Sequence, residues 1–502
     1  MNLYTALLTQ HPQEQSKIVI QQGEVHYTYA DLDSITARFA NLLASLAIPS
    51  GSRVAVHTDK SVEALMLYLA VLRAGYVYLP LNNAYQEAEL DYFIGNAEPA
   101  VVVCSSKNEA WVQALAHKHQ VKQVYTLNDD RTGSLLDAAL HLSREHQAAT
   151  KQADDLAAIL YTSGTTGRSK GAMLTHGNLL SNAQTLIDLW QFSAADVLIH
   201  ALPIFHVHGL FVASHCALLA GGQMRWQNKF DPKEVCASLP KATVFMGVPT
   251  LYVRLLGEAS FNKDSTKNMR LFVSGSAPLL LETFNEFKER TGHTILERYG
   301  MSETVMLTSN PYPQDQRKGG TVGFALPEVG VRISNAEGMA CGTEEIGNIE
   351  VRGPNVFAGY WRMPEKNKEE FTSDGWFKTG DVGKRDAMGY LTIVGRSKDL
   401  IISGGYNVYP AEIEGYLNDM AGVAESAVVG APHPDFGEAV VAFVVPKPGA
   451  ELLADSLLSA IKQKIANFKV PKRLSVLADL PRNSMGKVQK NLLREQVKNL
   501  FQ

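Results

Sequence analysis

An apolar segment that runs directly into a loop of glycine, serine and threonine most constrains what this chain can fold into. Leu156–Tyr161 is apolar and is typical of a buried strand, and the sequence YTSGTTGRSKG begins at its last residue. Glycine lets backbone N–H groups close on an anion, the hydroxyls add donors, and Arg168 or Lys170 supplies positive charge. This segment therefore predicts a phosphate-binding loop at the end of a buried strand.

Two other kinds of loop have a similar composition. A Walker A loop does not fit, because the pattern G-x-x-x-x-G-K-[ST] counted from Gly164 meets Ser169 where its second glycine should stand. A flexible Gly/Ser linker remains as an alternative, although a linker would lack the preceding apolar strand. We expect the next helix to begin near Asn178.

Length and composition indicate a globular protein of two or more domains. The chain has 502 residues, of which 45% are hydrophobic and 20% charged. A net charge of -4 gives no overall attraction to nucleic acid or to an anionic membrane, so any anion must be bound by a local cluster. The partners expected are therefore small molecules, without nucleic acid or stable membrane association, and the oligomeric state is left open.

The cysteines and the first residues favour a cytoplasmic protein. No C-x-x-C pair occurs, and the N-terminus lacks a signal-peptide pattern. No stretch is long and apolar enough to span a bilayer. We expect reduced, core-forming thiols at Cys104, Cys216, Cys236 and Cys341.

Strand-like and helix-like segments alternate early in the chain. Arg53–Val56, Tyr76–Leu81 and Ala100–Val103 are typical of strands. A helical pattern opens at Thr58, Asp59 or Ser61 and stops at Gly75. A spacing of roughly 20–30 residues between strands indicates βα units and a mostly parallel sheet. The fold class predicted is therefore α/β.

The phosphate loop resembles the signature loop of the adenylate-forming superfamily, which comprises acyl-CoA synthetases, peptide-synthetase adenylation domains and luciferases. Further motifs follow in the superfamily's order: the turn GSAP, the core Y-G-x-[ST]-E-T, the triplet T-G-D, the segment GRSKDLIISGGYNVYPAEIE, and a P-x-x-x-x-G-K motif near the C-terminus. The resemblance covers nearly the whole chain. It implies a large N-terminal ATP- and acyl-binding domain of mixed, largely parallel sheets with packed helices (residues 1–395). It also implies a small, mobile α+β C-terminal domain (residues 396–502).

The same resemblance implies ATP, Mg²⁺ and coenzyme A as co-substrates and assigns their ligands. Tyr299 would stack on adenine, Glu303 would hold Mg²⁺, and Lys487 would be the catalytic lysine, with Lys398 as the hinge. The coenzyme A ligands implied are Ser403, Gly404, Gly405 and Arg482. The ATP ligands implied are Thr162, Ser163, Gly164, Thr165, Thr166, Gly167, Lys170, Gly275, Ser276, Ala277, Pro278, Glu297, Tyr299, Gly300, Thr304, Asp381, Arg396 and Lys487.

The segment PIFHVHG carries two histidines behind a predicted strand. Taken alone, a neutral imidazole satisfied in the core is the favoured interpretation. The resemblance reverses this for His206, which would line the acyl pocket and join Lys487 and Glu303 as a catalytic residue. His208 is a candidate for the pocket wall.

Within the superfamily the chain is most similar to the malonyl-CoA synthetases, which implies ATP-dependent ligation of malonate to coenzyme A. A dicarboxylate keeps a second charge that must be paired, since burying an unpaired carboxylate is prohibitive. We expect Arg254 and Arg298 to bind that carboxylate, with Ser276 and Met306 beside them. Methylmalonate remains open, because the loop that ends at Gly320 lacks the proline common before that glycine.

Two rival functions remain. The substrate could be another short, medium-chain or aryl acid, in which case the arginines would form structural ion pairs. A luciferase-like or non-catalytic relative is the other alternative, although Glu303, Lys487 and the complete phosphate loop argue against it.

The chemistry explains why these parts are needed. Attack of a carboxylate on the α-phosphate brings anion to anion, so preorganised cations and N–H donors must face the developing charge. Lys487 would bridge the two anions. A thiolate must then attack from the side that Lys487 blocks, which is a reason for a C-terminal domain that swings about Lys398.

Overall fold

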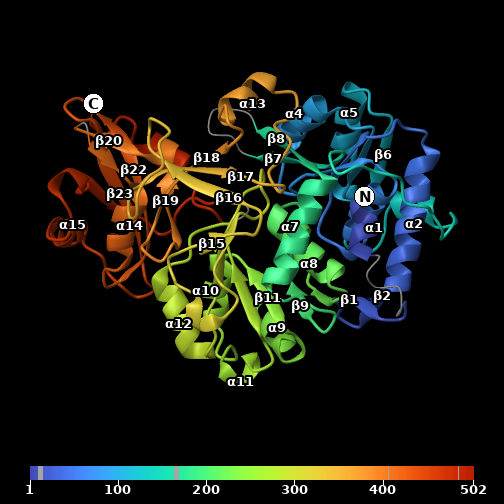
Figure 1. The fold of residues 1–502 in the computed structure, drawn as a ribbon, viewed down its shortest axis with the longest axis horizontal. Helices are drawn as coiled ribbons and strands as arrows, with labels where there is room; N and C mark the ends of the chain where they lie inside the picture. Colours follow the sequence, from blue (N-terminus) through green and yellow to red (C-terminus); the bar gives the residue numbers. More distant parts are fainter. Residues whose placement is uncertain (9–14, 163–168, 405, 484–485, 502) are drawn as a thin grey trace. The chain divides into compact units, whose positions relative to one another are not determined.

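The computed structural model describes residues 1–8, 15–162, 169–404, 406–483 and 486–501, and the counts below refer to these residues. The chain forms two compact units (Figure 1). The larger comprises Met1–Val331 and Val351–Phe377, and the smaller comprises Arg332–Glu350 and Lys378–Gln502. The predicted α/β class is confirmed, with a large N-terminal unit of mostly parallel strands and a smaller C-terminal one.

The division into units differs from the predicted boundary at residue 395. The chain leaves the larger unit within β16, returns to it within β17, and leaves it again after the first residue of β18. Residues 378–395 belong to the smaller unit, because β18 pairs antiparallel with β19. The boundary at residue 395 was predicted as the point about which a C-terminal domain moves. That movement stays a prediction.

A six-stranded sheet forms the first part of the larger unit, in the order β6-β5-β3-β4-β7-β8. Its pairings are parallel except for β8, which is antiparallel to β7. Helices alternate with strands from β3 to β6, so the predicted βα units are confirmed. The bounds are β3 (Arg53–His57), α3 (Val62–Arg73), β4 (Val77–Pro80), α4 (Glu87–Ala97), β5 (Val101–Cys104), α5 (Glu109–Lys118), β6 (Gln123–Thr126), β7 (Leu156–Thr162) and β8 (Lys170–Thr175).

Helix α3 shows how local sequence sets these elements. The Ser61 side chain accepts a hydrogen bond from the backbone N–H of Ala64 at 3.0 Å, which caps the first turn. Every residue of the helix is buried. Gly75 then ends it with φ at +82°, a left-handed conformation that glycine adopts without strain.

Strand β8 is a difference from the sequence analysis, which expected loop up to a helix near Asn178. Helix α7 is His176–Leu189, and the segment before it pairs with β7. Thr162 and Lys170 are register partners, so the phosphate loop connects two antiparallel strands. The predicted ligands in the loop lie outside the described residues: Ser163, Gly164, Thr165, Thr166 and Gly167.

A nine-stranded sheet forms the second part of the larger unit, in the order β15-β14-β13-β12-β11-β9-β10-β1-β2. The neighbours β11, β12 and β13 pair parallel, so their carboxyl ends meet at one edge, where ligands of α/β proteins bind. The bounds are β1 (Ile18–Gln22), β2 (Val25–Thr28), β9 (Val197–His200), β10 (Gln223–Trp226), β11 (Val244–Gly247), β12 (Leu271–Ser274), β13 (Leu296–Tyr299), β14 (Thr308–Ser309) and β15 (Phe324–Ala325).

The larger unit also contains the helices that follow. A π-helical turn, η2, runs directly into α8. The bounds are α1 (Leu3–Leu8), α2 (Tyr29–Ser45), α6 (Ser134–Ala139), η2 (His208–Ala213), α8 (Ser214–Leu219), α9 (Pro232–Ser238), α10 (Pro249–Leu256), α11 (Lys263–Thr266), α12 (Leu281–Thr291) and α13 (Pro364–Glu370).

The rest of the chain holds two further sheets, ordered β16-β17-β18-β19 and β21-β20-β23-β22, with β24 paired to β23. The strand bounds are β16 (Gly330–Ser334), β17 (Gly347–Arg352), β18 (Phe377–Arg385), β19 (Leu391–Arg396), β20 (Ile401–Ser403), β21 (Tyr406–Val408), β22 (Val423–His433), β23 (Gly437–Pro446) and β24 (Arg473–Val476). The helices are α14 (Pro410–Asn418), α15 (Ala454–Lys462) and α16 (Lys490–Val497).

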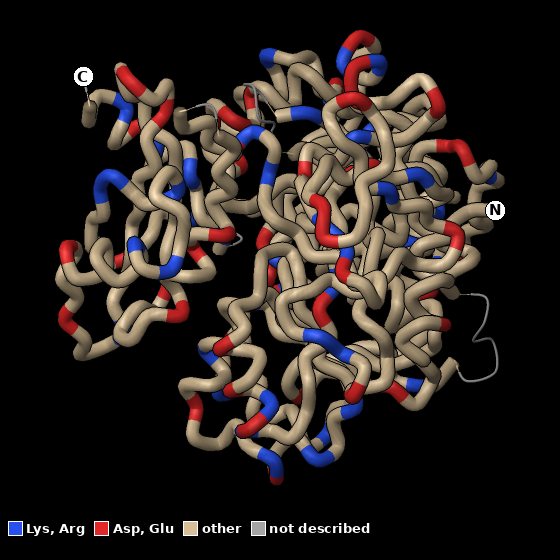
Figure 2. The backbone as a smooth tube through the Cα atoms, turned by 60° about the vertical axis from the view of Figure 1, so that its left-hand side comes forward, with Lys and Arg blue, Asp and Glu red and all other residues tan. Residues whose placement is uncertain are grey.

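The distribution of charged residues and the state of the cysteines follow the sequence-based expectations. Figure 2 shows basic and acidic residues interspersed along the backbone of the larger unit. Among the described residues, no helix combines the length and apolar character that crossing a bilayer requires. The four cysteines form no disulfide: Cys104, Cys216 and Cys236 are buried and Cys341 is half-buried.

Candidate active site

Three segments of the larger unit that are distant in sequence meet beside the described ends of the phosphate loop. The carboxylate of Glu303 accepts hydrogen bonds at Oε1 from the Tyr360 hydroxyl (2.8 Å) and from Thr162 Oγ1 (3.3 Å). Lys170 lies over the Tyr360 ring, 4.2 Å from its centroid, and forms an ion pair with Glu370 at 3.4 Å. Thr162, Lys170 and Glu303, which belong to two separate motifs in the sequence, are therefore linked through Tyr360 and the Glu303 carboxylate.

Tyr360 and Glu370 were not found from the sequence. They lie between the recognised motifs, and a tyrosine or glutamate there carries no local signal of a ligand role. Glu303 is 5% exposed and Lys170 is 9% exposed. Two buried groups of opposite charge around one ring form a site that can accept both a cation and phosphate oxygens.

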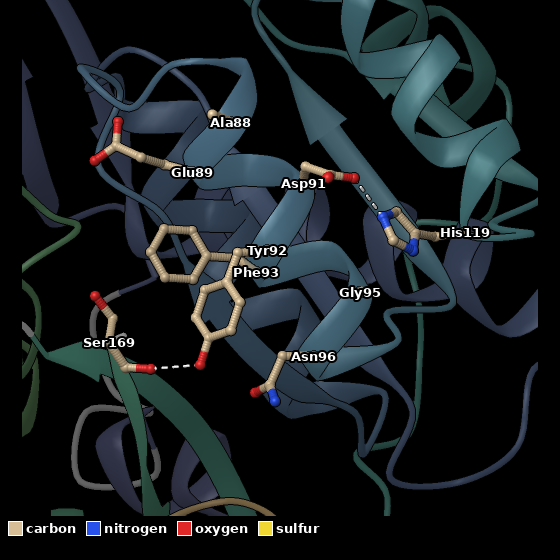
Figure 3. Close-up of a pocket in the computed structure, with 9 residues that line it drawn as sticks. All are labelled: Ala88, Glu89, Asp91, Tyr92, Phe93, Gly95, Asn96, His119 and Ser169. Atoms are coloured by element: carbon tan, nitrogen blue, oxygen red, sulfur yellow. Dashed lines mark hydrogen bonds and ion pairs between the residues drawn. The ribbon is translucent and has the colours of Figure 1, made fainter. Parts of the chain in front are cut away.

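The described end of the loop is fixed from its outer side by α4 (Figure 3). The Tyr92 hydroxyl donates to the Ser169 carbonyl at 2.7 Å, and the Tyr161 hydroxyl donates to Asn96 Oδ1 at 2.5 Å. The open hollow there, roughly 660 Å³, is lined from α4, His119 and Ser169. None of the predicted ligands lines it, so we interpret α4 as support for the loop.

Two non-glycine residues in the predicted adenine motifs have left-handed backbone conformations. Ser276, in the turn after β12, has φ of +70°, and Val305, after Glu303, has φ of +55°. Such conformations cost free energy and cluster at functional sites. Gly300 allows the second turn, because a Cβ there would lie 2.0 Å from the Val305 carbonyl oxygen.

Other predicted ligands in this region have definite surroundings. Thr304 is fully buried, and its Oγ1 has no hydrogen-bond partner among the described residues. Met306 is fully buried, and its carbonyl accepts from Asn182 and Asn355 at 2.9 and 2.8 Å. Tyr299 and Gly300 are half-buried, as are Ser276 and Ala277, while Pro278 is exposed and Gly275 is buried.

Glu297, the residue before Arg298 on β13, is a buried carboxyl group. Its Oε1 accepts one hydrogen bond from the Gly320 N–H at 3.1 Å. Burial raises the pKa of Glu297 to about 8, which that hydrogen bond only partly opposes. The group is therefore mainly protonated at neutral pH and can donate a hydrogen bond.

Arg298 is a buried cation that forms no ion pair with any described residue. It is 3% exposed, and among the described residues its Nε and Nη2 have no hydrogen-bond partner. Its guanidinium lies across Gly275, where a Cβ would be 2.5 Å from Cζ. Burial lowers the pKa of Arg298 to about 9. A group this costly to bury is suited to an anionic ligand.

His208, the first residue of η2, approaches the turn after β12. Its Nδ1 lies 3.5 Å from Ser276 Oγ, and its Nε2 is buried with no partner in the described chain. Burial, followed by the charge of Arg298, lowers the pKa of His208 well below its usual value. His206 contributes Nδ1 as acceptor for the His208 N–H at 3.3 Å. Arg298 and His208 thus have buried nitrogens without a partner among the described residues, and Ser276 lies beside His208. These three residues are called the acid pocket below.

Arg254 does not share this environment. It lies on the exposed side of α10, while Tyr252, Leu255 and Leu256 turn inward. The helical period places residue 254 opposite the buried face. Its role as a carboxylate ligand stays a prediction.

The T-G-D motif and the hinge segment are built together in the smaller unit. Asp381 and Arg396 are register partners on β18 and β19, with Arg396 Nε 3.1 Å from Asp381 Oδ1. Thr379 Oγ1 accepts from the Asp381 N–H at 3.1 Å and so braces the turn. Lys398 follows directly, and burial lowers the pKa of its amine, with the charge of Arg396 next in effect.

The backbone of Lys487 is held by two hydrogen bonds with Asn483. Its N–H donates to Asn483 Oδ1 at 3.0 Å, and its carbonyl accepts from the Asn483 N–H at 2.9 Å. Although the residue is exposed overall, crowding around the amine lowers the pKa of Lys487, and the charge of Arg396 adds to this. Arg396, Lys398 and Lys487 therefore lie within electrostatic reach of one another.

The predicted coenzyme A ligands have mixed surroundings. Ser403 is buried on β20, and the Gly404 N–H donates to the Phe436 carbonyl at 2.9 Å. Gly405 lies outside the described residues. Arg482 forms an ion pair with Glu425 and donates to the Gly486 carbonyl at 2.7 Å, contacts that stabilise the segment carrying Lys487.

Comparison with known proteins gives this geometry a context. The AMP-binding enzyme family matches residues 8–361, and the AMP-binding enzyme C-terminal domain matches residues 412–487. The crystal structure of ATP-bound MatB from Rhodopseudomonas palustris is 52% identical, covers 100% of this chain and 99% of its own, and superposes with a TM-score of 0.97.

Curated relatives match over nearly the whole chain. The malonate–CoA ligase of Arabidopsis thaliana is 32% identical, over 99% of this chain and 89% of the relative. The feruloyl-CoA synthase of an Amycolatopsis species is 33% identical, over 95% of each. The resemblance inferred from the ordered motifs is thereby confirmed, and the chain belongs to the family of AMP-binding enzymes.

Proposed function

We propose that this protein is an acid–thiol ligase that couples malonate to coenzyme A, using ATP and passing through malonyl-adenylate, with release of AMP and pyrophosphate. The family and the curated CoA ligases support the reaction class. The malonate–CoA ligase among these relatives also supports malonate as the acid, and a feruloyl-CoA synthase is related at a similar identity. The acid pocket gives the structural reason to choose malonate.

One observation carries that choice: the guanidinium of Arg298 is buried and lacks a counter-charge among the described residues. Malonate presents one carboxylate for activation and retains a second, which would pair with Arg298. Ser276 Oγ and His208 lie beside it as neutral donors. A neutral aryl or alkyl tail would instead leave a buried cation and a buried imidazole nitrogen without partners, at a cost of several kcal/mol.

The residues around the phosphate loop account for ATP and Mg²⁺. Mg²⁺ binds proteins through one or two carboxylates together with substrate phosphates, and Glu303, oriented by Tyr360 and Thr162, fits that requirement. When bound, the ion neutralises charge on the departing pyrophosphate. Lys170 would add a further positive charge at the same phosphates.

The smaller unit supplies the remaining groups for adenylation. Asp381 would accept the ribose hydroxyls, and Arg396, its ion-pair partner, would contact ribose or phosphate. Lys487 would bridge the attacking carboxylate and the α-phosphate. Crowding around the Lys487 amine lowers its pKa because the charged form is poorly solvated. An anionic ligand would therefore stabilise the ammonium strongly.

Thioester formation requires a second arrangement, because Lys487 would occupy the side from which the thiolate attacks. Movement about Lys398 would withdraw Lys487 and present Ser403 and Gly404 to the pantetheine arm. The proposal includes a cytoplasmic location and small molecules as the only partners. Methylmalonate is a second candidate acid, since the acid pocket recognises the carboxylate that both acids share.

A panel of acids tests the proposal. Coenzyme A-dependent release of AMP and pyrophosphate should be measured with malonate, methylmalonate, butyrate, octanoate and coumarate. We expect kcat/KM for malonate to exceed that for butyrate, which matches it closely in size, by at least about 10²-fold, since a broken buried pair costs roughly 3–5 kcal/mol. Equal or better use of coumarate or octanoate would refute malonate as the substrate while leaving the ligase class intact.

A further inference from the structure

A buried lysine outside the recognised motifs is tied to the acid pocket. Lys60 lies between β3 and α3 and is 9% exposed. Its ammonium has three N–H donors and three acceptors: His200 Nδ1 at 3.0 Å, the His200 carbonyl at 2.8 Å and the Gln227 carbonyl at 2.7 Å. The Trp226 ring covers it, 4.3 Å from the centroid.

The contacts of both ring nitrogens fix the tautomer of His200. The Gly209 carbonyl can only accept, so Nε2, which lies 3.0 Å from it, carries the ring proton. Nδ1 is then left to accept from the Lys60 amine at 3.0 Å, although burial lowers the pKa of that amine. The imidazole is held neutral, since burial and then the charge of Lys60 lower the pKa of His200 well below its usual value. Stacking against Trp226, with centroids 4.6 Å apart, fixes the plane of the ring.

The Nε2–H of His200 points at the π-helical turn η2. Nε2 lies 3.0 Å from the Gly209 carbonyl oxygen and 3.1 Å from Ser214 Oγ. The same carbonyl accepts from Ser214 through both its N–H and its hydroxyl, the latter at 2.9 Å. The widened turn is therefore closed by three donors on one oxygen, and His200 supplies the one that comes from another element.

The geometry of this turn decides where His208 points. A π turn contains one residue more than an α-helical turn, and one residue corresponds to a rotation of about 100° around the helix axis. If η2 relaxed to an α-helical turn, His208 would rotate away from Ser276, which its Nδ1 now approaches at 3.5 Å. Gly209 permits the turn, since a Cβ there would lie 2.1 Å from the Pro203 carbonyl oxygen.

We propose that Lys60 and His200 are positioning residues for the acid pocket: Lys60 holds His200 as its Nε2–H tautomer, and His200 holds the Gly209 carbonyl so that the π turn directs His208 toward the acid. This inference rests on the proposed function, because the pocket it concerns is the one assigned to the distal carboxylate. It predicts an effect on binding of the acid and none on ATP.

The experiment uses the full chain and Lys60→Met, which keeps the length of the side chain and removes the donors. Adenylation is followed by pyrophosphate release at varied malonate and varied ATP. We expect KM for malonate to rise by about 10-fold or more and KM for ATP to change less than twofold. Lys151→Met is the matched control, since Lys151 is also 9% exposed and contacts Ser50 instead of the acid pocket's supports; it should leave both constants unchanged.

A spectroscopic readout reports the tautomer directly. In protein labelled with ¹⁵N-histidine, the His200 signals are identified by their loss in His200→Gln. We expect an Nε2–H tautomer in the unaltered protein and its loss in Lys60→Met. This measurement stands even if malonate is the wrong acid, in which case the KM prediction applies to the acid that the panel selects.

A rescue separates positioning from general damage. Glutamine can place an N–H near the position of Nε2 without help from Lys60, so Lys60→Met combined with His200→Gln should bring KM for the acid back to within about threefold of the unaltered enzyme. Should Lys60→Met fail to fold, His200→Gln and His200→Leu replace it, with KM raised only in the second. The proposal is overturned if KM for the acid is unchanged in Lys60→Met, or if KM for the acid and KM for ATP rise together. It is also overturned if Lys151→Met has the same effect as Lys60→Met, or if His200→Gln and His200→Leu change KM for the acid alike.

Discussion

Replacing Arg298 by methionine removes a cation that the fold buries, and we expect stability and malonate activity to change in opposite directions. Burial lowers the pKa of Arg298 from 12.5 to about 9. At 1.36 kcal/mol per pKa unit this corresponds to a penalty of up to about 5 kcal/mol for the charged form in the ligand-free protein. Because methionine carries no such penalty, Arg298→Met should raise the free energy of unfolding by about 1–4 kcal/mol, the range seen when buried ionic groups are replaced by apolar ones.

The same substitution should damage catalysis with malonate. The distal carboxylate would be left without its cation, at a cost of roughly 3–5 kcal/mol, which is on the order of 10²- to 10³-fold or more in kcat/KM. Activity toward butyrate should hold or rise, since that complex loses an unpaired cation. Arg254→Met should cost less than about 1 kcal/mol, because Arg254 is exposed.

Arg317 provides a matched control. It is also buried, at 8% exposed, but donates to the carbonyls of Thr294 (2.5 Å), Pro311 (3.3 Å) and Tyr312. Arg317→Met leaves these carbonyls without a donor and should lower the free energy of unfolding by about 1–3 kcal/mol. We expect the activities toward malonate and butyrate to change alike.

The assays are thermal and urea unfolding without ligand and pyrophosphate release with each acid. An Arg298→Met protein that is less stable than the unaltered one would mean that the guanidinium has a structural partner. Parallel loss of malonate and butyrate activity, with the fold intact by circular dichroism, would make Arg298 structural and reopen the choice of acid.

Three further predictions concern other groups. Lys487→Ala should abolish adenylation but leave thioester formation from supplied malonyl-adenylate largely intact; equal loss in both half-reactions would contradict a role confined to the first. Lys398→Pro, which holds φ near about -65°, should spare adenylation and impair thioester formation, and a uniform effect on both steps would show that Lys398 is no hinge. Burial raises the pKa of Glu297 from 4.5 to about 8, so its contribution to stability is complete below pH 4.5 and is lost as pH rises to 8, by up to about 5 kcal/mol. Glu297→Gln should flatten that fall in pH-dependent unfolding, and an unchanged slope would assign the pH dependence to other groups.

The sequence by itself determined the elements whose signals are local. The apolar run before the phosphate loop predicted β7, and Gly75 predicted the end of α3, because left-handed turns depend on neighbouring residues. The start of α3 was narrowed to three candidate caps, of which the structure selects Ser61. The order of the motifs was sufficient for the family. Strand β8 was missed, since a short apolar run beside a glycine-rich loop has no periodicity to separate strand from loop.

Only the tertiary structure decided which charged groups are desolvated. Arg254 and Arg298 were treated as equivalent in the sequence, yet one lies on the outer face of α10 and the other is buried across Gly275. The same holds for Lys60, whose three acceptors come from strand ends about 140 or more residues away in the chain. Burial and pairing are properties of packed elements that are distant in sequence, so no local pattern of residues can specify them.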